Sequence, residues 1–338
     1  MRPRPLVSIC VPTFRGAPWI LETLATALAQ TLGDFEVLVV DDASDDDTVA
    51  RARSIGDPRV RVVACRRNVG LPGNWNRAAS LARGRFVKWL LQDDVLYPRC
   101  LERLVAPALA RDDVDLVFGP RDLIFDEPHS REAREFRGYG SMLHRAFPTL
   151  LPVNERGALS SPWIAAHCLK NWIGEPTAVL VRRSALERHG GFHVRMTQLV
   201  DMEMWGRLAF HGAVAFVDEP LSAFRVHARS ASRRQTSSGV DWLDQLYLVE
   251  GLLRDPAIAS AHPELYRWRA HERRRVLRRT LRPFSGGPRL AVRRALPGLR
   301  AYAVDRFLRV LGRAPPIHGV IPPVDLVASS APRVTESA

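Results

Sequence analysis

The chain has 338 residues, of which 46% are hydrophobic, 25% charged and 8% aromatic. This composition is that of a folded globular protein and excludes a disordered chain, a collagen-like repeat and a disulfide-dense small scaffold. The 49 Lys and Arg against 36 Asp and Glu give a net charge of +13, and Lys88 and Lys170 are the only lysines. An arginine surplus of this size favours anionic partners such as nucleotide phosphates, acidic lipids, nucleic acid or acidic glycans.

The cysteines and the N-terminal segment indicate the compartment. The four cysteines lie far apart and form no Cys-x-x-Cys pair, so we expect free thiols and a reducing environment. The apolar stretch that follows the basic start ends at Pro12, which is too early for a signal peptide. No window contains the roughly 18 apolar residues of a membrane-spanning helix. We therefore expect a cytoplasmic protein.

Short apolar segments alternate with helical patterns through the first 118 residues. These segments are apolar throughout rather than alternating with polar residues, which is typical of strands buried on both faces. They predict strands at 6–11, 35–40, 60–63, 86–91 and 116–118, and the patterns between them predict helices at 18–28, 74–83 and 98–110. Such an alternation indicates an α/β fold with a mostly parallel sheet flanked by helices.

Polar side chains follow three of the predicted strands. Thr13 follows the first, Asp41 and Asp42 follow the second, and Asp93 and Asp94 follow the fourth. Because ligands of parallel sheets bind beyond the carboxyl ends of the strands, we expect these side chains to meet on one rim.

The remainder of the chain is less regular. Residues 120–170 predict loops and short helices that form a variable lobe, and a second ordered block covers 174–232. This block predicts strands at 178–181 and 214–217 and helices from Ser184 and over 200–210. Two further helices are predicted at 242–253 and 299–310. Fifteen Arg lie from Arg267 to Arg313, against two acidic residues.

These patterns predict three parts of the chain. Residues 1–235 form one domain with two halves, 1–120 and 121–235. Residues 236–315 form a helical, basic extension. Residues 316–338 are rich in Pro, Ser and Ala and form a disordered tail.

The paired carboxylates allow two interpretations. Asp93 and Asp94 supply hard oxygen ligands suited to Mg²⁺ or Mn²⁺, or they cap the helix that follows. Asp41 and Asp42 accept hydrogen bonds from a base or a ribose, or they cap a helix in the same way.

Three residues of the second block are further candidates. Asp201 and Glu203 would lie about 200° apart on a helix, so one acid faces the site and the other pairs structurally. His227 is a lone histidine, by default a structural residue and otherwise a metal ligand from a distant segment.

Several segments that carry these residues resemble the family 2 glycosyltransferases of the GT-A fold. The segments are PLVSICVPTFRG, FEVLVVDDASDDDT, NVGLPGNWNRAASLARGRFVKWLLQDDVLYP, GEPTAVLVRRS, LVDMEMWGRLAFHG and EPLSAFRVHARSAS. They cover roughly residues 5–232 in the order of the family, about two thirds of the chain. The resemblance implies a Rossmann-like, mostly parallel sheet flanked by helices, followed here by the arginine-rich extension. It also implies that residues 1–235 are a catalytic domain, with a nucleotide-binding half at 1–120 and an acceptor half at 121–235.

The resemblance also implies roles for individual residues. It implies a nucleotide site built from Pro12, Thr13, Asp41, Asp42, Asn68, Gly70, Arg77 and Asp93. It implies Asp201 as the catalytic base, Asp94 and His227 as ligands of Mn²⁺ or Mg²⁺, and Glu175, Glu203 and Trp205 as acceptor-binding residues. Two positions depart from the family pattern. Leu91 replaces an acid of the metal motif, which leaves open whether Asp93 or Asp94 binds the ion. Val200 replaces the acid before the base and leaves Glu203 as the alternative base.

The function that the resemblance implies is an inverting transfer of a sugar from a nucleoside diphosphate to a hydroxyl. UDP-sugars are favoured as donors and guanosine donors remain open. The acceptor would be a glycan or a lipid-linked sugar in cell-surface or exopolysaccharide synthesis. With an ordinary pKa of about 3.9, Asp201 would be ionised at neutral pH.

Two other functions compete with this one. A nucleotidyltransferase or nucleotide-sugar hydrolase could use a similar sheet, although VPTFRG is a poor version of a Gly-rich phosphate loop. A non-catalytic basic module could bind membranes or nucleic acid. We expect no nucleic acid partner. The extension would pack on the catalytic domain, contact a second copy of the chain, or lie on the anionic inner face of a membrane as a peripheral contact.

Overall fold

The computed structural model describes residues 4–130, 133–134, 136–137, 144, 149–166, 168, 171–230, 243–281 and 318. Eight strands form one sheet in the order β3-β2-β1-β4-β9-β6-β10-β8. Their bounds are β3 (Val60–Ala64), β2 (Phe35–Asp41), β1 (Val7–Thr13), β4 (Phe86–Trp89), β9 (Val179–Arg182), β6 (Val114–Phe118), β10 (Ala213–Phe216) and β8 (Val153–Asn154).

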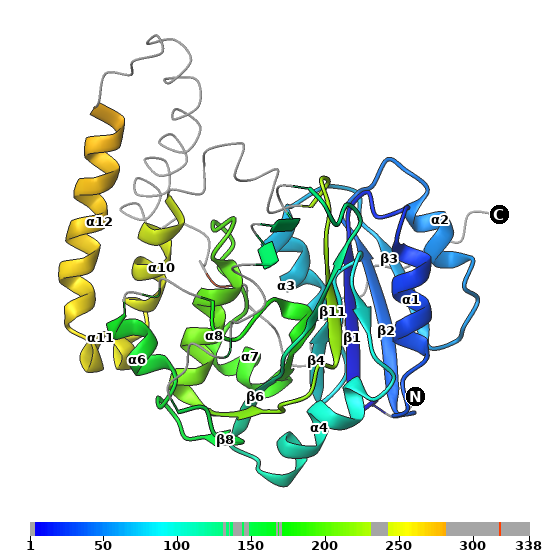
Figure 1. The fold of residues 1–338 in the computed structure, drawn as a ribbon, viewed down its shortest axis with the longest axis horizontal. Coiled ribbons are helices and arrows are strands. Elements are labelled where there is room, and N and C mark those ends of the chain that lie inside the picture. The colour runs from blue at the N-terminus through cyan, green and yellow to red at the C-terminus, as the bar shows by residue number, and fades with distance from the viewer. Residues whose placement is uncertain are drawn as a thin grey trace.

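Helices cover both faces of this sheet (Figure 1). One face carries α1 (Ile20–Leu28), α2 (Thr48–Arg53) and α4 (Cys100–Ala110), and the other carries α3 (Leu71–Leu81), α6 (Ser160–Ala165), α7 (Arg183–His189) and α8 (Val200–His211). Alternate residues of a strand enter opposite cores: in β2, Val37 and Val39 pack in one cluster, and Leu38 and Val40 pack in the other. The apolar segments of β1, β2, β4 and β6 are therefore strands buried on both faces, as predicted, whereas β3 at the edge of the sheet is only partly buried.

The sheet is mixed, because β9 runs antiparallel to both β4 and β6. The pairs of β1 with β2 and β4, of β2 with β3 and of β6 with β10 are parallel. The first five predicted strands are present, whereas nothing in the apolar run of β9 indicated its direction. Helix α3 begins at Leu71, three residues before its predicted start, because Pro72 occupies the first turn.

A second, small sheet was not predicted. It has the order β5 (Val95–Leu96), β11 (Ser222–Val226) and β7 (Asp122–Phe125), and β11 pairs with β5 antiparallel and with β7 parallel. Strand β5 has two residues and β7 is half-exposed, so neither carries a readable apolar pattern. This sheet places the end of β11 beside the loop that follows β4.

The helices of the extension share the core of the catalytic part. These are α10 (Asp244–Leu252), α11 (Pro256–Ala261) and α12 (Glu264–Leu281). Leu246, Leu252 and Trp268 belong to the same hydrophobic cluster as Trp205 of α8. The Asp244 carboxylate accepts hydrogen bonds from the backbone N–H groups of residues 197–199, the loop before α8. This packing is the first of the arrangements expected for the extension.

Two further expectations concern the end of the chain. The predicted helix at 299–310 and the predicted tail at 316–338, apart from His318, lie outside the described residues. His318 lies 2.9 Å from Glu203 of α8. Among the helices that the structure does describe, none combines the length and apolarity needed to cross a membrane.

The shared core generates a stability prediction. Leu246→Ala should lower the free energy of unfolding by about 2–5 kcal/mol, because Leu246 is fully buried between α10 and the catalytic part. Leu109→Ala is the matched control: this leucine of α4 is 46% exposed, and its loss should change stability by about 0.5 kcal/mol or less. Urea denaturation measures both. Equal effects of the two substitutions would contradict a shared core.

Candidate functional site

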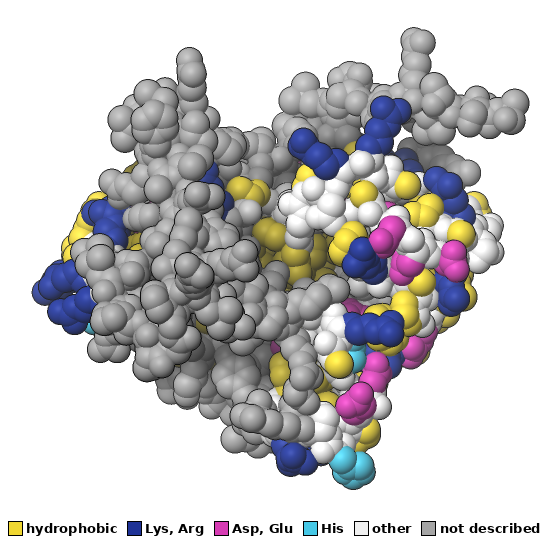
Figure 2. Space-filling model, turned by 90° about the horizontal axis from the view of Figure 1, so that it is seen from above, with side chains coloured by type: hydrophobic (Ala, Val, Ile, Leu, Met, Phe, Trp, Pro, Cys, Tyr) yellow, Lys and Arg dark blue, Asp and Glu magenta, His cyan; other side chains and the backbone are white. Residues whose placement is uncertain are grey.

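A cleft of about 480 Å³ lies at the carboxyl ends of β1, β2 and β4. Figure 2 looks onto this edge of the molecule and shows it hollowed near the centre. Of the residues predicted to bind a nucleotide, the cleft is lined by Pro12, Thr13, Asp42, Asn68, Gly70 and Asp93. Of the residues predicted for catalysis or the acceptor, it is lined by Glu175 and Asp201. The predicted convergence on one rim is thus present for these side chains.

Asp41 lies behind the cleft and fixes its neighbours. Its carboxylate accepts hydrogen bonds from the Thr13 hydroxyl at 3.0 Å and from the backbone N–H of Ser44 at 2.8 Å. The carboxylate is almost fully buried and does not line the cleft. Asp41 therefore orients Thr13, which does.

Asp42 organises the loop on the other side of the cleft. Its carboxylate accepts hydrogen bonds from the backbone N–H groups of Val69 and Gly70, both at 2.9 Å. Arg77, which the resemblance placed in the nucleotide site, instead donates to Asp42 at 3.2 Å and does not line the cleft. Gly70 has φ +81°, so the loop makes a turn there that glycine adopts without strain.

The structure corrects the placement of Asp94. This carboxylate is fully buried and accepts hydrogen bonds from the Thr177 hydroxyl at 2.5 Å and from the Arg225 backbone N–H at 2.8 Å. Burial and the neighbouring charge of Asp93 raise its pKa. Both oxygens accept hydrogen bonds from protein donors, so Asp94 joins β11 to the segment 176–178 and does not line the cleft.

Asp93 points the other way and lines the cleft. Its carboxylate lies 2.8 Å from Nε2 of His227, and the imidazole packs 4.1 Å from the Trp19 ring. Nδ1 of His227 accepts from the backbone N–H of Arg229 at 3.2 Å, which assigns the ring proton to Nε2 in the neutral form. The distant histidine and one member of the acidic pair thus meet at the edge of the cleft.

Asp201 lies in the first turn of α8, at the wall of the cleft. Its carboxylate accepts hydrogen bonds from the Asn171 side chain at 3.0 Å and from the Met202 backbone N–H at 2.8 Å. Burial, and secondly the charge of Glu175, raise the pKa of Asp201 to about 7. The expectation of an ordinary pKa was therefore wrong, because the sequence does not show this burial.

Glu175 is held at the cleft by a buried arginine. Nε and Nη2 of Arg121 lie 2.7 and 3.0 Å from its two carboxylate oxygens. The side chain of Arg121 is almost fully buried and that of Glu175 is mostly buried. This two-point contact holds the carboxylate of Glu175 in place opposite Asp201.

The structure also corrects Glu203. Its side chain is fully buried and pairs with Arg207 at 3.0 Å and His318 at 2.9 Å, away from the cleft. Burial alone would raise its pKa, but Arg207 and His318 lower it overall. As the helical spacing predicted, the two acids of α8 diverge, and it is Glu203 that makes the structural pair.

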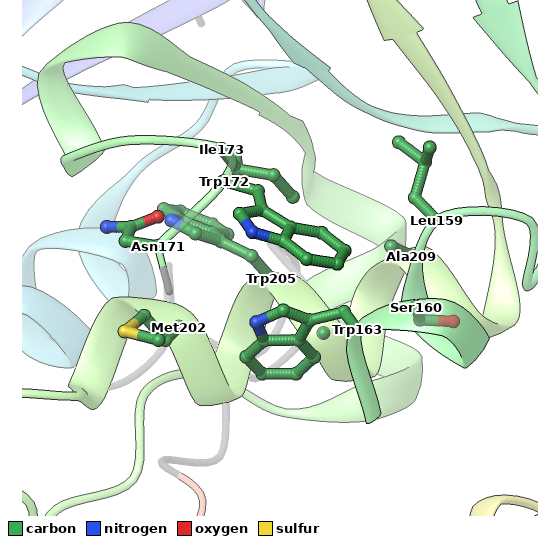
Figure 3. A pocket seen from close by; sticks show the side chains of 10 residues that line it. Leu159, Ser160, Trp163, Asn171, Trp172, Ile173, Met202, Trp205 and Ala209 are labelled. Atoms are coloured by element: carbon green, nitrogen blue, oxygen red, sulfur yellow. The ribbon is translucent and has the colours of Figure 1, made fainter. Parts of the chain in front are cut away.

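Trp205 lines a second, narrow cavity behind Asp201 rather than the cleft. This cavity of about 20 Å³ has room for roughly one water molecule and is walled by Trp163, Trp172 and Trp205 (Figure 3). The Trp205 indole donates to the Gly174 carbonyl at 3.0 Å. Trp163 packs directly on Gly206 of α8, where an added Cβ would lie 1.9 Å from its ring.

Sequence reasoning missed several residues of the site. Arg225 and Arg229 line the cleft, Asn171 donates to Asp201, and Thr177 donates to Asp94. Arg225 is paired with Glu22 at 2.7 Å and Asp126 at 3.1 Å, whereas no carboxylate among the described residues forms a salt bridge with Arg229. The sequence pointed to Arg229 only through its position, two residues after the predicted metal ligand His227.

Comparison with known proteins is consistent with this geometry. Residues 8–160 match the family model for glycosyl transferase family 2. An uncharacterised protein of Mycobacterium tuberculosis is 32% identical over 253 residues, which cover 75% of this chain and 77% of that protein. The succinoglycan biosynthesis protein ExoO of Rhizobium meliloti is 39% identical over 119 residues, or 33% of this chain and 34% of ExoO. The chain thus spans only about a third of this second relative.

Two solved structures share the fold. TarS of S. aureus, in complex with UDP-GlcNAc, has a TM-score of 0.54 at 18% identity and covers 73% of this chain and 66% of its own. The mannosyltransferase PcManGT of Pyrobaculum calidifontis, in complex with GDP-Man and Mn²⁺, has a TM-score of 0.52 at 21% identity. The match covers 92% of this chain and 84% of PcManGT. The likeness confirms the GT-A fold that the sequence resemblance implied.

The placement of the two neighbouring acids generates a prediction. Asp94→Ala removes the acceptor of two buried donors, each of which costs about 1–3 kcal/mol when left without a partner, so the free energy of unfolding should fall by several kcal/mol. Asp93→Ala should cost less, about 1–3 kcal/mol, because it leaves a single donor, Nε2–H of His227, without its partner. Urea denaturation compares the two proteins. A larger loss in Asp93→Ala would contradict the assigned placement.

Proposed function

Because the chain belongs to glycosyl transferase family 2 and is a glycosyltransferase of the GT-A fold, we propose that it transfers a sugar from a nucleoside diphosphate to an acceptor hydroxyl with inversion. The observation that carries the proposal is Asp201, a carboxylate with a pKa near 7 at the wall of the cleft. Asp201 lies across the cleft from the residues predicted to bind the nucleotide, a position that suits a base acting on an incoming hydroxyl.

The donor is bound at the carboxyl ends of β1, β2 and β4. Thr13 and the loop at 68–70 provide polar groups for the base and ribose, and Asp93 lies at the diphosphate end. A UDP-sugar is the favoured donor. TarS was solved with UDP-GlcNAc and PcManGT with GDP-Man, so the titration below compares the uracil and guanine nucleotides. The similarity to ExoO supports a place in exopolysaccharide synthesis, with a glycan or lipid-linked acceptor.

Asp93 and His227 are the proposed ligands of Mn²⁺ or Mg²⁺. Among the described residues no group of three or more His, Cys, Asp or Glu side chains is arranged to hold a metal ion. Two ligands nevertheless fit these ions, which usually complete their shell with substrate phosphates and water. Binding at Nε2 would require His227 to give up the proton that now lies toward Asp93. When bound, the ion would neutralise charge on the departing diphosphate.

The chain's own residues perform the transfer in one displacement. Asp201 accepts the proton of the acceptor hydroxyl as its oxygen attacks the anomeric carbon, and the bond from that carbon to the diphosphate breaks on the opposite side. One displacement inverts the anomeric configuration. Asn171 and the Met202 N–H hold the carboxylate in place. Arg229, which lines the cleft two residues after His227, is placed to stabilise the leaving diphosphate.

The acceptor approaches on the side of Glu175. The bidentate pair with Arg121 holds this carboxylate where it can accept a hydrogen bond from a neighbouring acceptor hydroxyl. Its charge also raises the pKa of Asp201, which strengthens the base. Glu203 has no part in binding, because Arg207 and His318 occupy it. Trp205 supports the site from behind through the aromatic cavity.

The raised pKa of Asp201 generates a prediction for the pH profile. The base acts only when deprotonated, so kcat/KM for release of UDP from a UDP-sugar, with water as acceptor, should fall about tenfold per pH unit below about 7. Asp201→Asn should lower kcat by about 10²–10⁴-fold at neutral pH. Glu175→Gln should move the acidic limb to lower pH, because it removes a charge that raises the pKa. A profile that stays flat down to pH 5 would exclude Asp201 as the base.

Calorimetric titration tests the donor and the metal ligands. UDP should bind more tightly with Mn²⁺ than without it, and Asp93→Ala or His227→Ala should remove the difference. Asp113→Ala, an exposed acid that pairs with Arg111 far from the cleft, is the matched control. Mn²⁺-dependent binding of GDP in place of UDP would change the donor. Unchanged Mn²⁺ dependence in Asp93→Ala would contradict the assignment of the ligand.

A further inference from the structure

Five of the seven arginines of α12 fall into two sets. The inner set is neutralised: Arg273 pairs with Glu250 of α10 at 2.7 Å, and Arg275 pairs with Glu272 at 2.6 Å. These contacts, together with buried Leu265, fix the helix against the rest of the protein. The outer set makes no such pairs with the residues that the structure describes.

The outer set forms one straight row, which we call the outer stripe. It consists of Arg267, His271, Arg274 and Arg278, all exposed. Their spacing of four, three and four residues keeps them within about 60° of one another on the helix and spans about 16 Å. The buried residues of α12 lie on the opposite side. Figure 2 shows Lys and Arg side chains gathered at the left edge, where α12 lies in Figure 1.

No carboxylate among the described residues forms a salt bridge with this row, and only Arg267 lies near enough to an acid, Glu264, to interact with its charge. The two acids of α12 are occupied elsewhere, because Glu264 binds His262 at 2.8 Å and Glu272 is buried beside Arg275. Arg274 donates only to the Ala270 carbonyl of its own helix. Within the part of the chain that the structure describes, the outer stripe therefore presents three guanidinium groups that form no salt bridge.

We propose that the outer stripe is a docking surface for an anionic lipid bilayer, which the protein contacts with α12 parallel to the membrane plane. Charge complementarity carries the proposal: guanidinium groups pair strongly with phosphate, and a straight row on a convex edge matches a flat anionic surface. Tyr266, which is 48% exposed beside Arg267, adds an aromatic side chain of the kind enriched at membrane interfaces. The row offers neither a groove nor a set of aromatic platforms for nucleic acid. This proposal does not depend on the proposed reaction.

The expected affinity follows from the number of free arginines. Each arginine close to an anionic surface should raise the affinity about five-fold, so three together should raise it about 10²-fold. The attraction acts over a Debye length of about 8 Å at physiological salt, so it should be largely lost in about 0.5 M salt.

Flotation of the full chain with vesicles tests the proposal. The protein should float with vesicles of phosphatidylcholine mixed with phosphatidylglycerol and should stay behind with phosphatidylcholine alone. The variant with Arg267→Gln, Arg274→Gln and Arg278→Gln should lose about 10²-fold in affinity. Arg274→Gln alone should lose about five-fold, which provides a second test if the triple variant does not fold.

A charge-matched variant shows whether position matters. Arg51→Gln, Arg53→Gln and Arg99→Gln also remove three exposed positive charges, but from α2 and the start of α4. This variant should float as the unchanged protein does. Equal losses in the two triple variants, or no loss in either, would overturn the proposal.

Two further outcomes would also overturn it. These are failure of the unchanged protein to float with phosphatidylglycerol vesicles, and tighter binding of a short duplex DNA or RNA than of those vesicles at the same salt. UDP binding is measured on the same samples. It should be equal in all variants, so a failure of membrane docking would leave the proposed reaction untouched.

Discussion

The buried carboxylate of Asp94 joins the parts of the molecule that meet at the cleft. It accepts hydrogen bonds from Thr177, which precedes β9, and from the backbone of Arg225 in β11. The Thr177 carbonyl in turn accepts a hydrogen bond from the buried ammonium group of Lys88 in β4. A single side chain thus fixes the large sheet, the small sheet and the loop of Asp93 relative to one another. The position of every cleft residue from these elements depends on that arrangement.

Two acids of helix α8, Asp201 and Glu203, have different roles although they lie only two positions apart. Asp201 faces the cleft and has a pKa near neutrality because it is buried beside another acid. Glu203 faces the protein interior, where the contacts with Arg207 and His318 lower its pKa and keep it ionised. Two carboxylates on one helix therefore differ in proton affinity through their surroundings alone.

The fold was largely predictable from the sequence, and the details of the site were not. Apolar strands and helical spacing are local properties, so they located the first five strands and the rim that follows them. The orientation of Asp93 and Asp94 depends on Thr177 and Arg225, which lie 83 and 131 residues from Asp94 in sequence. The pairing of Arg77 with Asp42 and the raised pKa of Asp201 likewise arise from tertiary contacts. No local pattern records such contacts.

The bonds made by Asp244 limit how this protein can be divided. This residue lies beyond the predicted catalytic boundary at 235, yet its carboxylate receives backbone N–H groups from the loop that contains Thr197 and Gln198, two residues of the cleft wall. Removing the extension would leave these N–H groups without their acceptor. The catalytic part is therefore not an interchangeable module: a chimera that joined it to the extension of another protein would have to supply a carboxylate at the same place.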